Sequence, residues 1–543
     1  MDAQFSVPVP RNEPVRGYAP GSPERVTLQA RVEALAAERL ELTNTIDGVQ
    51  KRAGGDAIEV VQPHKRHHVL GVTYNSTHED AAAAVAAAKR AAPGWRALPY
   101  SERAAVFLRA AEMLAGGWRD TLNAATILGQ SKSALQAEID SACELIDFLR
   151  FNVAFGEQIL AEQPQSAPGF WNRFDHRPLE GFVYAITPFN FTAIAGNLPS
   201  APALMGNTVV WKPSPTQQFS AHFTMRLFEA AGLPPGVINM VTGDGLAVSD
   251  VVLADPDLAG IHFTGSTATF RHLWREVGSN IDRYRAYPRL VGETGGKDFV
   301  FAHPSADVDA LHTALVRGAY EYQGQKCSAA SRAYVPRGIW EGGGLRDRLA
   351  ATVASIKYGD VTDLSTFGGA VIDGRAFAKH AAALDRIKNS AACTVLAGGT
   401  ADDSEGWFVA PTLVESSDPA HEVFTTEYFG PILGVHVYED GDFEAAVAQA
   451  ESVSPYALTG SIFATDRAVV DWAATALRNA AGNFYINDKP TGAVVGQQPF
   501  GGARGSGTND KAGSMLNLLR WVSPRTIKET FEPPTAWQYP HMG

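Results

Sequence analysis

One cysteine of the sequence lies in a polar setting that is unusual for a structural thiol. Cys327 follows Gly-Gln-Lys and precedes Ser-Ala-Ala-Ser within EYQGQKCSAASRAYV (321–335). A thiol that fills a core ordinarily lies in an apolar, periodic run, and this one does not. Gly324 allows close approach of the backbone, and N–H groups at the start of a following helix would favour a thiolate. The pattern indicates a nucleophile, with a structural cysteine as the alternative.

A glutamate at the end of an apolar strand is a candidate base. Glu293 lies in LVGETGGKDFVF (290–301), directly before a threonine and two glycines. Ligands bind at the carboxyl ends of parallel strands, and the glycines keep the space around the carboxylate open. A carboxylate in such a place can take a proton from a reacting water. The alternative is a solvated loop glutamate.

Two polar residues follow strands in ITPFNFTAIAGNLPSAPALMGNTVVWKPSP (186–215). Asn190 lies between two phenylalanines, where its amide could donate to a developing oxyanion. Lys212 ends the next strand, where its ammonium could meet ribose hydroxyls or a phosphate. Since lone Asn and Lys residues in loops are usually solvated, each signal is weak by itself.

The segment IHFTGSTATF (261–270) predicts a strand, a Gly265–Ser266 turn and then a helix. The N–H groups at the start of a helix bind phosphate groups. The usual GxGxxG fingerprint of dinucleotide sites is missing at this point, so a polar turn with a helix cap is the competing interpretation.

The elements that must position these residues alternate between strand and helix. From residue 181, short apolar strands (GFVYAIT, NTVVWK, GVINMVT, LAGIHFT) alternate with helical stretches, and the rhythm starts again after Glu293. We therefore predict two α/β lobes, each with a parallel sheet, and a boundary near Glu293. The first ~160 residues are predicted to be mainly helical, with Ser101 as a helix cap and Cys143 in the core.

Composition restricts the class of protein. The chain has 543 residues, a net charge of −12 and three cysteines. The charge argues against nucleic-acid binding, and the cysteines are too few for a disulfide framework or a CxxC zinc site. The histidine-rich PHKRHH (63–68) lacks acidic partners, so we interpret it as a solvated strand or loop and predict no metal. With neither a signal sequence nor an apolar run of ~18 residues, we expect a soluble cytoplasmic protein.

Eight short blocks in register resemble the aldehyde dehydrogenase superfamily over about residues 60–530. The blocks are PFNF, GNTVVWKPS, LPPGVINMVTG, FTGS, ETGGK, GQKCSAASR, EYFGPIL and PFGGARGSG. The resemblance implies an α/β fold with a Rossmann-type parallel-sheet cofactor domain, an α/β catalytic domain and a small β oligomerisation element. The implied boundaries are 20–162 and 184–292 for the NAD-binding domain, 293–490 for the catalytic domain, and 163–183 with 505–543 for oligomerisation.

The resemblance also implies a role for each candidate residue. Cys327 is expected to be the nucleophile, Glu293 the general base for the hydrolytic water, and Asn190 an oxyanion donor together with the Cys327 N–H. The expected NAD-binding residues are Thr187, Lys212, Gly265, Ser266, Thr267, Ala268, Thr269 and Glu427. The expected substrate-binding residues are Ser328, Gly492, Ala493, Phe191, Phe500 and Glu144.

Four blocks (ITPFNFTAI, ETGGKD, QKCSAASR and VVGQQPFGGARGSGTNDKAG) are most similar to members that oxidise L-glutamate γ-semialdehyde to glutamate in proline catabolism. Ala493 replaces a serine common in those members, and Pro215 replaces an acid that often disfavours NADP. NAD is the expected cofactor, with NADP use left open. The alternatives are another small semialdehyde as substrate, a catalytically silent fold, or a cysteine hydrolase; the last is disfavoured because no histidine flanks these blocks.

The resemblance has consequences for partners. The C-terminal segment LNLLRWVSPRTIKETFEPPTAWQYPHMG (516–543) predicts a strand and an irregular arm that docks on another subunit. We expect a homodimer or a higher homo-oligomer that binds a small molecule but no nucleic acid or membrane. The length leaves no room for a fused proline dehydrogenase domain of ~300 residues, so transient contact with a separate proline dehydrogenase is open.

Overall fold

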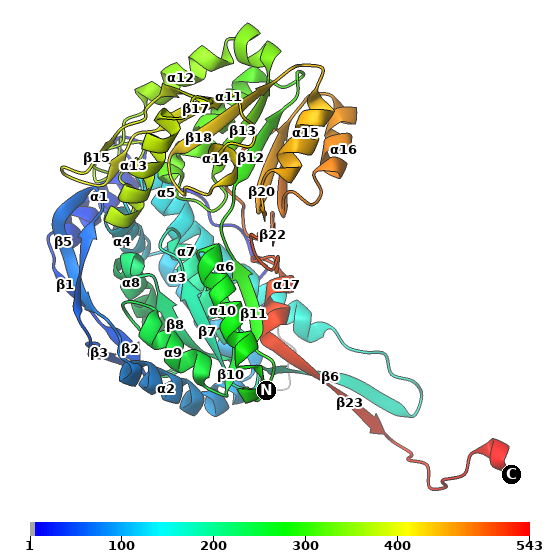
Figure 1. Ribbon diagram of the computed structural model, residues 1–543. Coiled ribbons are helices and arrows are strands. Elements are labelled where there is room, and N and C mark those ends of the chain that lie inside the picture. Colours follow the sequence, from blue (N-terminus) through cyan, green and yellow to red (C-terminus); the bar gives the residue numbers. More distant parts are fainter. Residues whose placement is uncertain (1–5) are drawn as a thin grey trace.

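The computed structural model describes residues 6–543 and shows two sheet-centred lobes and a projecting arm (Figure 1). The sheet of the first lobe has the strand order β11-β10-β7-β8-β9-β2-β3. Its strands are β2 (Asn44–Ile46), β3 (Val49–Lys51), β7 (Phe182–Thr187), β8 (Thr208–Pro213), β9 (Ile238–Met240), β10 (Leu258–Thr264) and β11 (Arg289–Glu293). Strands β7 to β11 pair in parallel, whereas β2 and β3 are antiparallel additions at one edge.

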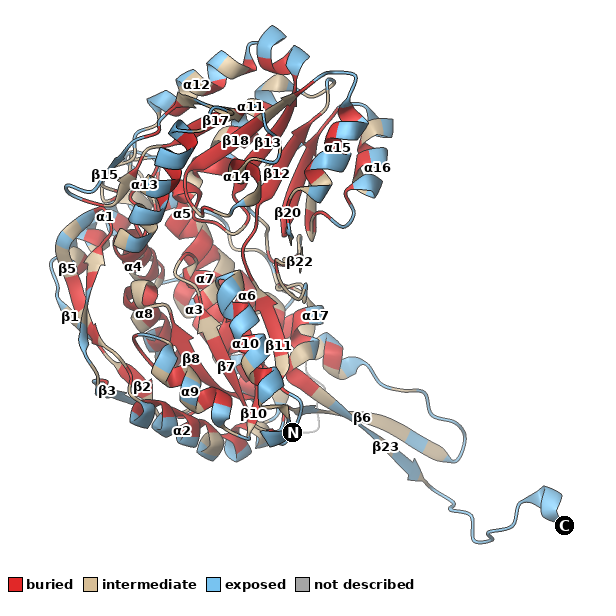
Figure 2. Cartoon of the chain, viewed as in Figure 1, coloured by how far each residue is buried: buried red, intermediate tan, exposed pale blue. Residues whose placement is uncertain are grey.

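Both faces of this sheet are covered by helices, which explains why its central strands are apolar without interruption. Phe182 and Tyr184 of β7 pack on one face, and Val183 and Ala185 pack on the other. The first face is covered by α2 (His78–Ala97), α9 (Leu246–Ala254) and α10 (Thr267–Ser279). The other is covered by α3 (Tyr100–Ala115), α6 (Glu144–Ala161), α7 (Thr192–Leu204) and α8 (Gln218–Ala230). Figure 2 shows the buried strands between these helices.

The second lobe repeats the design with the strand order β14-β17-β18-β13-β12-β20-β21, in which β14 alone is antiparallel. Its strands are β12 (Asp298–Ala302), β13 (Ala330–Pro336), β14 (Cys393–Ala397), β17 (Thr412–Ser416), β18 (Ile432–Tyr438), β20 (Thr459–Phe463) and β21 (Asn483–Ile486). Its helices are α11 (Val308–Tyr320), α12 (Leu345–Ser355), α13 (Gly374–Lys388), α14 (Glu422–Thr425), α15 (Phe443–Ser452) and α16 (Arg467–Ala476).

The remaining α-helices and β-strands lie outside these two seven-stranded sheets. They are α1 (Pro23–Ala36), β1 (Leu40–Leu42), β4 (Ala57–Gln62), β5 (Lys65–Tyr74), α4 (Arg119–Gln130), α5 (Ala134–Ala137), β6 (Phe170–Pro178), β15 (Ala401–Asp402), β16 (Phe408–Val409), β19 (Tyr456–Ala457), β22 (Ala503–Arg504), α17 (Met515–Leu518) and β23 (Val522–Thr530). The predicted strands after residue 181 are confirmed. The exact domain boundaries stay predictions, although β11 ends the first sheet at Glu293 and β12 begins the second at Asp298.

Two local predictions for the N-terminal region are wrong, and a third is only partly right. The stretch after Ala36 is not helical, because residues 40–74 form the strands β1 to β5. Ser101 does not cap a helix: α3 begins at Tyr100 after Pro99, so Ser101 lies within the first turn and makes no cap bond. PHKRHH enters strand β5 at Lys65 and is partly exposed there, as predicted, but the His64 side chain is buried against Ser131 and Asp360. Cys143 is buried, as predicted.

The arm consists of two long antiparallel strands that leave the body of the molecule. β23 pairs with β6 over its whole length, from Val522↔Pro178 to Thr530↔Phe170 (Figure 1). Beyond the ladder, residues 531–543 are exposed. Trp171 and Phe531, at its far end, are 51% and 61% exposed, which is unusual for large apolar side chains. Within residues 6–543, no helix is both long and apolar enough to cross a membrane.

Candidate active site

Cys327 is positioned by a left-handed stretch of backbone between α11 and β13. Tyr322, Gln323 and Gly324 have φ values of 50°, 54° and 64°, which turn the chain sharply before the thiol. The Gln323 amide fixes this turn by donating to the carbonyls of Ser131 (3.1 Å) and Ala370 (2.7 Å). The expectation of a helix after Cys327 is wrong: strand β13 follows, so no helix N-terminus stabilises a thiolate.

The thiol instead faces a carboxylate. Cys327 Sγ donates to Glu293 Oε1 across 3.5 Å. Burial raises the pKa of the Cys327 thiol well above its ordinary value, and the negative charge of Glu293 adds to the effect. Burial also raises the pKa of Glu293 to about 7, against smaller opposing effects of the Cys327 hydrogen bond and the Lys511 cation. A carboxylate with a near-neutral pKa that contacts a thiol is suited to accept a proton.

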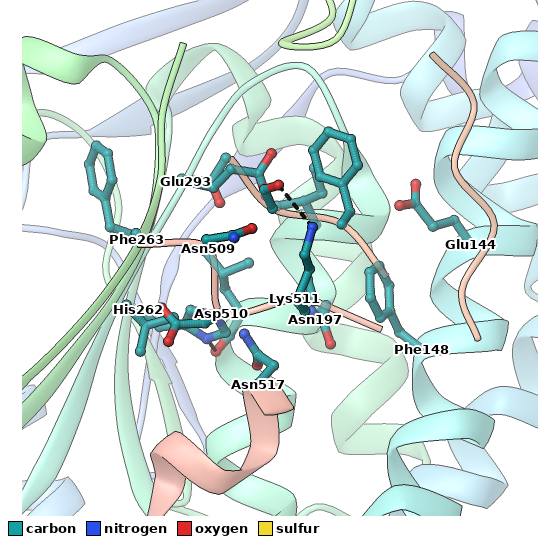
Figure 3. A pocket seen from close by; sticks show the side chains of 18 residues that line it. Glu144, Phe148, Asn197, His262, Phe263, Glu293, Asn509, Asp510, Lys511 and Asn517 are labelled. Carbon is teal, nitrogen blue, oxygen red and sulfur yellow. Dashed lines mark hydrogen bonds between the residues drawn. The ribbon is translucent and has the colours of Figure 1, made fainter. Parts of the chain in front are cut away.

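Glu293 is held by backbone contacts on both sides. Gly292 exchanges hydrogen bonds with Thr508, and the Thr294 hydroxyl donates to Gly505 O at 2.6 Å. Gly265 N donates to Glu293 O at 3.2 Å, which ties the candidate phosphate turn to the candidate base. Glu293 and Lys511 line a pocket between α6 and the 500–512 segment (Figure 3). The Glu293 carboxylate therefore projects from the end of strand β11 into this pocket.

Asn190 reaches the cysteine loop from the first lobe. It follows β7 and immediately precedes the start of α7, and its side chain is buried. Its Nδ2 donates one hydrogen bond to Gln325 O at 3.0 Å, two residues before Cys327. A primary amide carries two donors, so the second N–H is left for another acceptor.

The six predicted substrate residues and Cys327 line one pocket, here called the Cys327 pocket. Its wall includes Glu144, Phe191, Cys327, Ser328, Gly492, Ala493 and Phe500. Ser328 and Thr491 hydroxyls are hydrogen-bonded at 2.7 Å. The Cys327 pocket and the pocket in Figure 3 share wall residues, including Glu144, Phe148 and Phe500, so the thiol and the base open onto neighbouring spaces.

The predicted cofactor residues are distributed over both lobes. Ser266 caps α10 by accepting from Thr269 N, and the turn 265–269 forms that helix N-terminus. Lys212 is buried at the end of β8, and burial lowers its pKa to about 8. Glu427 and Cys327 also line a third pocket, and the Glu427 carboxylate accepts a hydrogen bond from Gly296 N at 2.9 Å. Thr187 accepts from Trp211 Nε1 at 3.0 Å; neither Thr187 nor Lys212 lines these three pockets.

Two residues of the site were missed by sequence reasoning. Thr491 contacts Ser328, and the only sequence feature that could have indicated this residue is its position directly before Gly492. Lys511 lies in the block PFGGARGSGTNDKAG, where its cation affects the pKa of Glu293. Its ammonium is fixed by Gly482 O at 2.7 Å, Asn483 Oδ1 at 3.2 Å and Gly501 O at 3.3 Å.

Comparisons with known proteins agree with the motif blocks. The family model described as the aldehyde dehydrogenase family matches residues 49–527. A probable delta-1-pyrroline-5-carboxylate dehydrogenase of Schizosaccharomyces pombe is 48% identical, with 99% of each chain covered. The mitochondrial delta-1-pyrroline-5-carboxylate dehydrogenase of Mus musculus is 47% identical over 98% of this chain and 94% of its own.

A solved structure is similar over the whole chain. The delta-pyrroline-5-carboxylate dehydrogenase of Mycobacterium tuberculosis bound with NAD superposes with a TM-score of 0.97, at 63% identity and with 100% of each chain covered. The predicted fold class and the predicted resemblance are thereby confirmed. With a family model that spans most of its length and relatives this similar, the chain belongs to the aldehyde dehydrogenase family.

Proposed function

We propose that this chain catalyses the NAD-dependent oxidation of L-glutamate γ-semialdehyde to L-glutamate, the second step of proline catabolism. The observation that carries the proposal is the 3.5 Å contact between Cys327 Sγ and Glu293 Oε1, beside a pocket that contains Ser328, Gly492 and Ala493. The relatives named delta-1-pyrroline-5-carboxylate dehydrogenase support the choice of substrate.

The chemistry begins with the thiol. A carbonyl gives up a hydride readily only after a nucleophile has made its carbon tetrahedral, and a thiolate is a good nucleophile and leaving group. Because burial and Glu293 disfavour a standing thiolate, the Cys327 proton passes to Glu293 as sulfur attacks the aldehyde carbon. The product of this step is a thiohemiacetal on Cys327.

The oxyanion of the thiohemiacetal requires fixed donors. The free N–H of Asn190 and the backbone N–H of Cys327 supply them in this proposal, since the Asn190 amide is already held against Gln325 O. Removing one donor of this kind typically costs about 3 kcal/mol of transition-state stabilisation. The donors act before and after hydride loss, because hydrolysis of the thioester passes through a second oxyanion.

The residues present fit a dinucleotide. The α10 N-terminus at 265–269 suits a pyrophosphate, and Lys212 and Glu427 suit ribose hydroxyls. When bound, NAD supplies the hydride acceptor that converts the thiohemiacetal to a thioester. Glu293 first gives up the Cys327 proton to solvent and then takes a proton from the water that attacks the thioester. The C–S bond breaks, the acid is released, and the Cys327 sulfur recovers a proton from Glu293. Pro215, at the start of the turn after β8, places no carboxylate there that would oppose a 2′-phosphate.

Substrate choice depends on hydrogen bonds, since a small semialdehyde with a carboxylate and an ammonium offers few apolar atoms. Ser328 and the backbone N–H groups of Gly492 and Ala493 would hold the carboxylate, and Glu144 would face the ammonium. Phe191 and Phe500 would flank the aliphatic part. Sites that pair a substrate's polar groups reject analogues lacking them by about 10⁴-fold in favourable cases.

Formation of NADH by the purified chain with glutamate γ-semialdehyde tests the proposal. We expect turnover with NAD to exceed that with NADP, and Cys327→Ala to abolish turnover while leaving the fold intact. A panel of aldehydes ranked by kcat/KM separates this substrate from another small semialdehyde. Near-full activity in Cys327→Ala, or a different aldehyde ranked first, would contradict the proposal.

Assembly and location are also proposals. We propose a homodimer that forms through the β6–β23 arm, because the arm exposes large apolar side chains away from the body. The expected cytoplasmic location stays a prediction, and several relatives are named as mitochondrial proteins. Contact with a separate proline dehydrogenase likewise stays a prediction.

A further inference from the structure

Asn12, near the start of the described chain, connects two walls of the Cys327 pocket. Its Nδ2 donates to Asp147 Oδ2 of α6 at 2.8 Å and to Val495 O at 2.9 Å. Gln497 Nε2 in turn donates to Asn12 Oδ1 at 2.9 Å. Both functional ends of this amide are therefore used, and both reach residues far away in the sequence.

The segment that Asn12 contacts continues the candidate carboxylate-binding turn. Residues 491–495 and Gln498 line the Cys327 pocket, and they include Gly492 and Ala493. Gly492 and Gly496 have φ values of +97° and +79°, so this turn contains two residues with wide conformational freedom. A turn of this kind holds a precise geometry only when outside contacts support it.

The other wall comes from α6, on which Glu144 and Phe148 line the same pocket. Asp147, next to Phe148, is buried and accepts hydrogen bonds from Asn12 Nδ2 and from Glu13 N at 2.7 Å. The N-terminal segment is itself anchored by ion pairs of Glu13 with Arg119 and Arg150. Asn12 is thus presented from a fixed segment and is not a chance surface contact.

We propose that Asn12 is a positioning residue that holds the Gly492–Ala493 turn against α6 and so sets the affinity for the substrate carboxylate. The inference rests on the proposed function, because it concerns the carboxylate end of that substrate. Asn12 touches neither Cys327 nor Glu293, so it acts on substrate binding and leaves the bond-making steps unaffected.

Steady-state kinetics of the full chain with two aldehydes test the inference. Gln497→Ala should raise KM for glutamate γ-semialdehyde about tenfold, the equivalent of one lost hydrogen bond, and Asn12→Ala, which removes three, should raise KM at least as much. The kcat of both variants with glutamate γ-semialdehyde should stay unchanged. With the uncharged aldehyde pentanal, both kcat and KM should stay unchanged. Since the two side chains share one bond, the double variant should be less impaired than the product of the two single effects. Arg11→Ala, at the exposed neighbouring position, is the matched control and should behave as wild type.

The other possible outcomes contradict either this inference or the proposed function. An active wild type whose KM is insensitive to both variants overturns the inference alone. Equal losses with both aldehydes, accompanied by a lower Tm, would assign Asn12 a purely structural role and also overturn it. If Asn12→Ala fails to fold, Gln497→Ala decides by the same criteria. A folded wild type with no activity on glutamate γ-semialdehyde refutes the proposed function instead.

Discussion

At the scale of single residues, the proposed chemistry depends on one thiol and one carboxylate, each of which affects the pKa of the other. Cys327 contacts Glu293 at 3.5 Å, and burial raises the pKa values of both groups. An isolated cysteine in this setting would be a poor nucleophile at neutral pH. In the proposed reaction Glu293 removes that difficulty, because a base with a pKa of about 7 can accept a proton and release it again near neutral pH.

Replacing Glu293 by Gln should lower turnover by about 100- to 10,000-fold, the usual contribution of a general base. In wild type, only the ionised Glu293 accepts a proton, so kcat should rise with pH through about 7 and level off above it. Stopped-flow and steady-state measurements of NADH between pH 5.5 and 8.5 check this.

Lys511→Met is the companion variant of this experiment. The Lys511 cation lowers the pKa of Glu293, so its removal should move the midpoint of the pH profile upward. A Glu293→Gln variant that keeps the wild-type rate and pH profile would exclude Glu293 as the base.

At the scale of elements, the site depends on turns that leave the carboxyl ends of β7, β10 and β11 and on the turn before β13. The last of these is the tightest, with three consecutive residues from Tyr322 in left-handed conformations. A Cβ at Gly324 would lie 2.4 Å from Gly430 O and 3.0 Å from Ala319 O. The position therefore requires glycine both for its dihedral angle and for its space.

Gly324→Ala should destabilise the protein by at least about 2 kcal/mol, since the left-handed conformation and the carbonyl clash both oppose the methyl group. Activity should fall further than stability, because Cys327 lies at the end of the displaced turn. Gly342→Ala is the control, since a Cβ there meets no atom within 4 Å. Thermal melts and NADH assays measure both effects; a fully active Gly324→Ala enzyme would disprove the requirement.

At the scale of the whole molecule, the β6–β23 arm carries large apolar side chains that the rest of the chain leaves exposed. Trp171 is 51% exposed on β6, yet the ladder with β23 is complete in register. A two-stranded ribbon is marginally stable by itself, so a partner surface is expected to cover it. Trp521, just before the arm, and Val522, the first residue of β23, are both buried.

A chain truncated after Val522, and the point variant Trp171→Glu, should both shift the protein from two chains to one. The reason is that each removes apolar surface that the proposed dimer covers. Light scattering after size exclusion gives the mass, and the Tm of each variant shows whether the body stays folded. Unchanged dimers in both variants would place the subunit interface elsewhere.

Much of the fold was predictable from the sequence alone. The apolar runs around Val183, Val209 and Phe299 are long enough and flanked by turn residues, so local pattern indicates buried strands. The candidate catalytic residues were also recognisable by type, since Cys327, Glu293 and Asn190 each lie at or just after the end of an element in a polar or glycine-rich context. Sequence reasoning failed at residues 37–74, where short strands are fixed by pairing with one another and, for β2, with the distant strand β9.

Only the tertiary structure decided which residues meet. Cys327 and Glu293 are separated by 34 positions, and Asn12 and Gln497 by 485, and no local pattern encodes such contacts. The structure also replaced an expected helix after Cys327 with a strand, which is why we propose Glu293, and not a helix N-terminus, as the group that activates the thiol. Periodicity and residue type are local properties that the sequence carries directly. Proximity and pKa arise from burial, which exists only after the chain has folded.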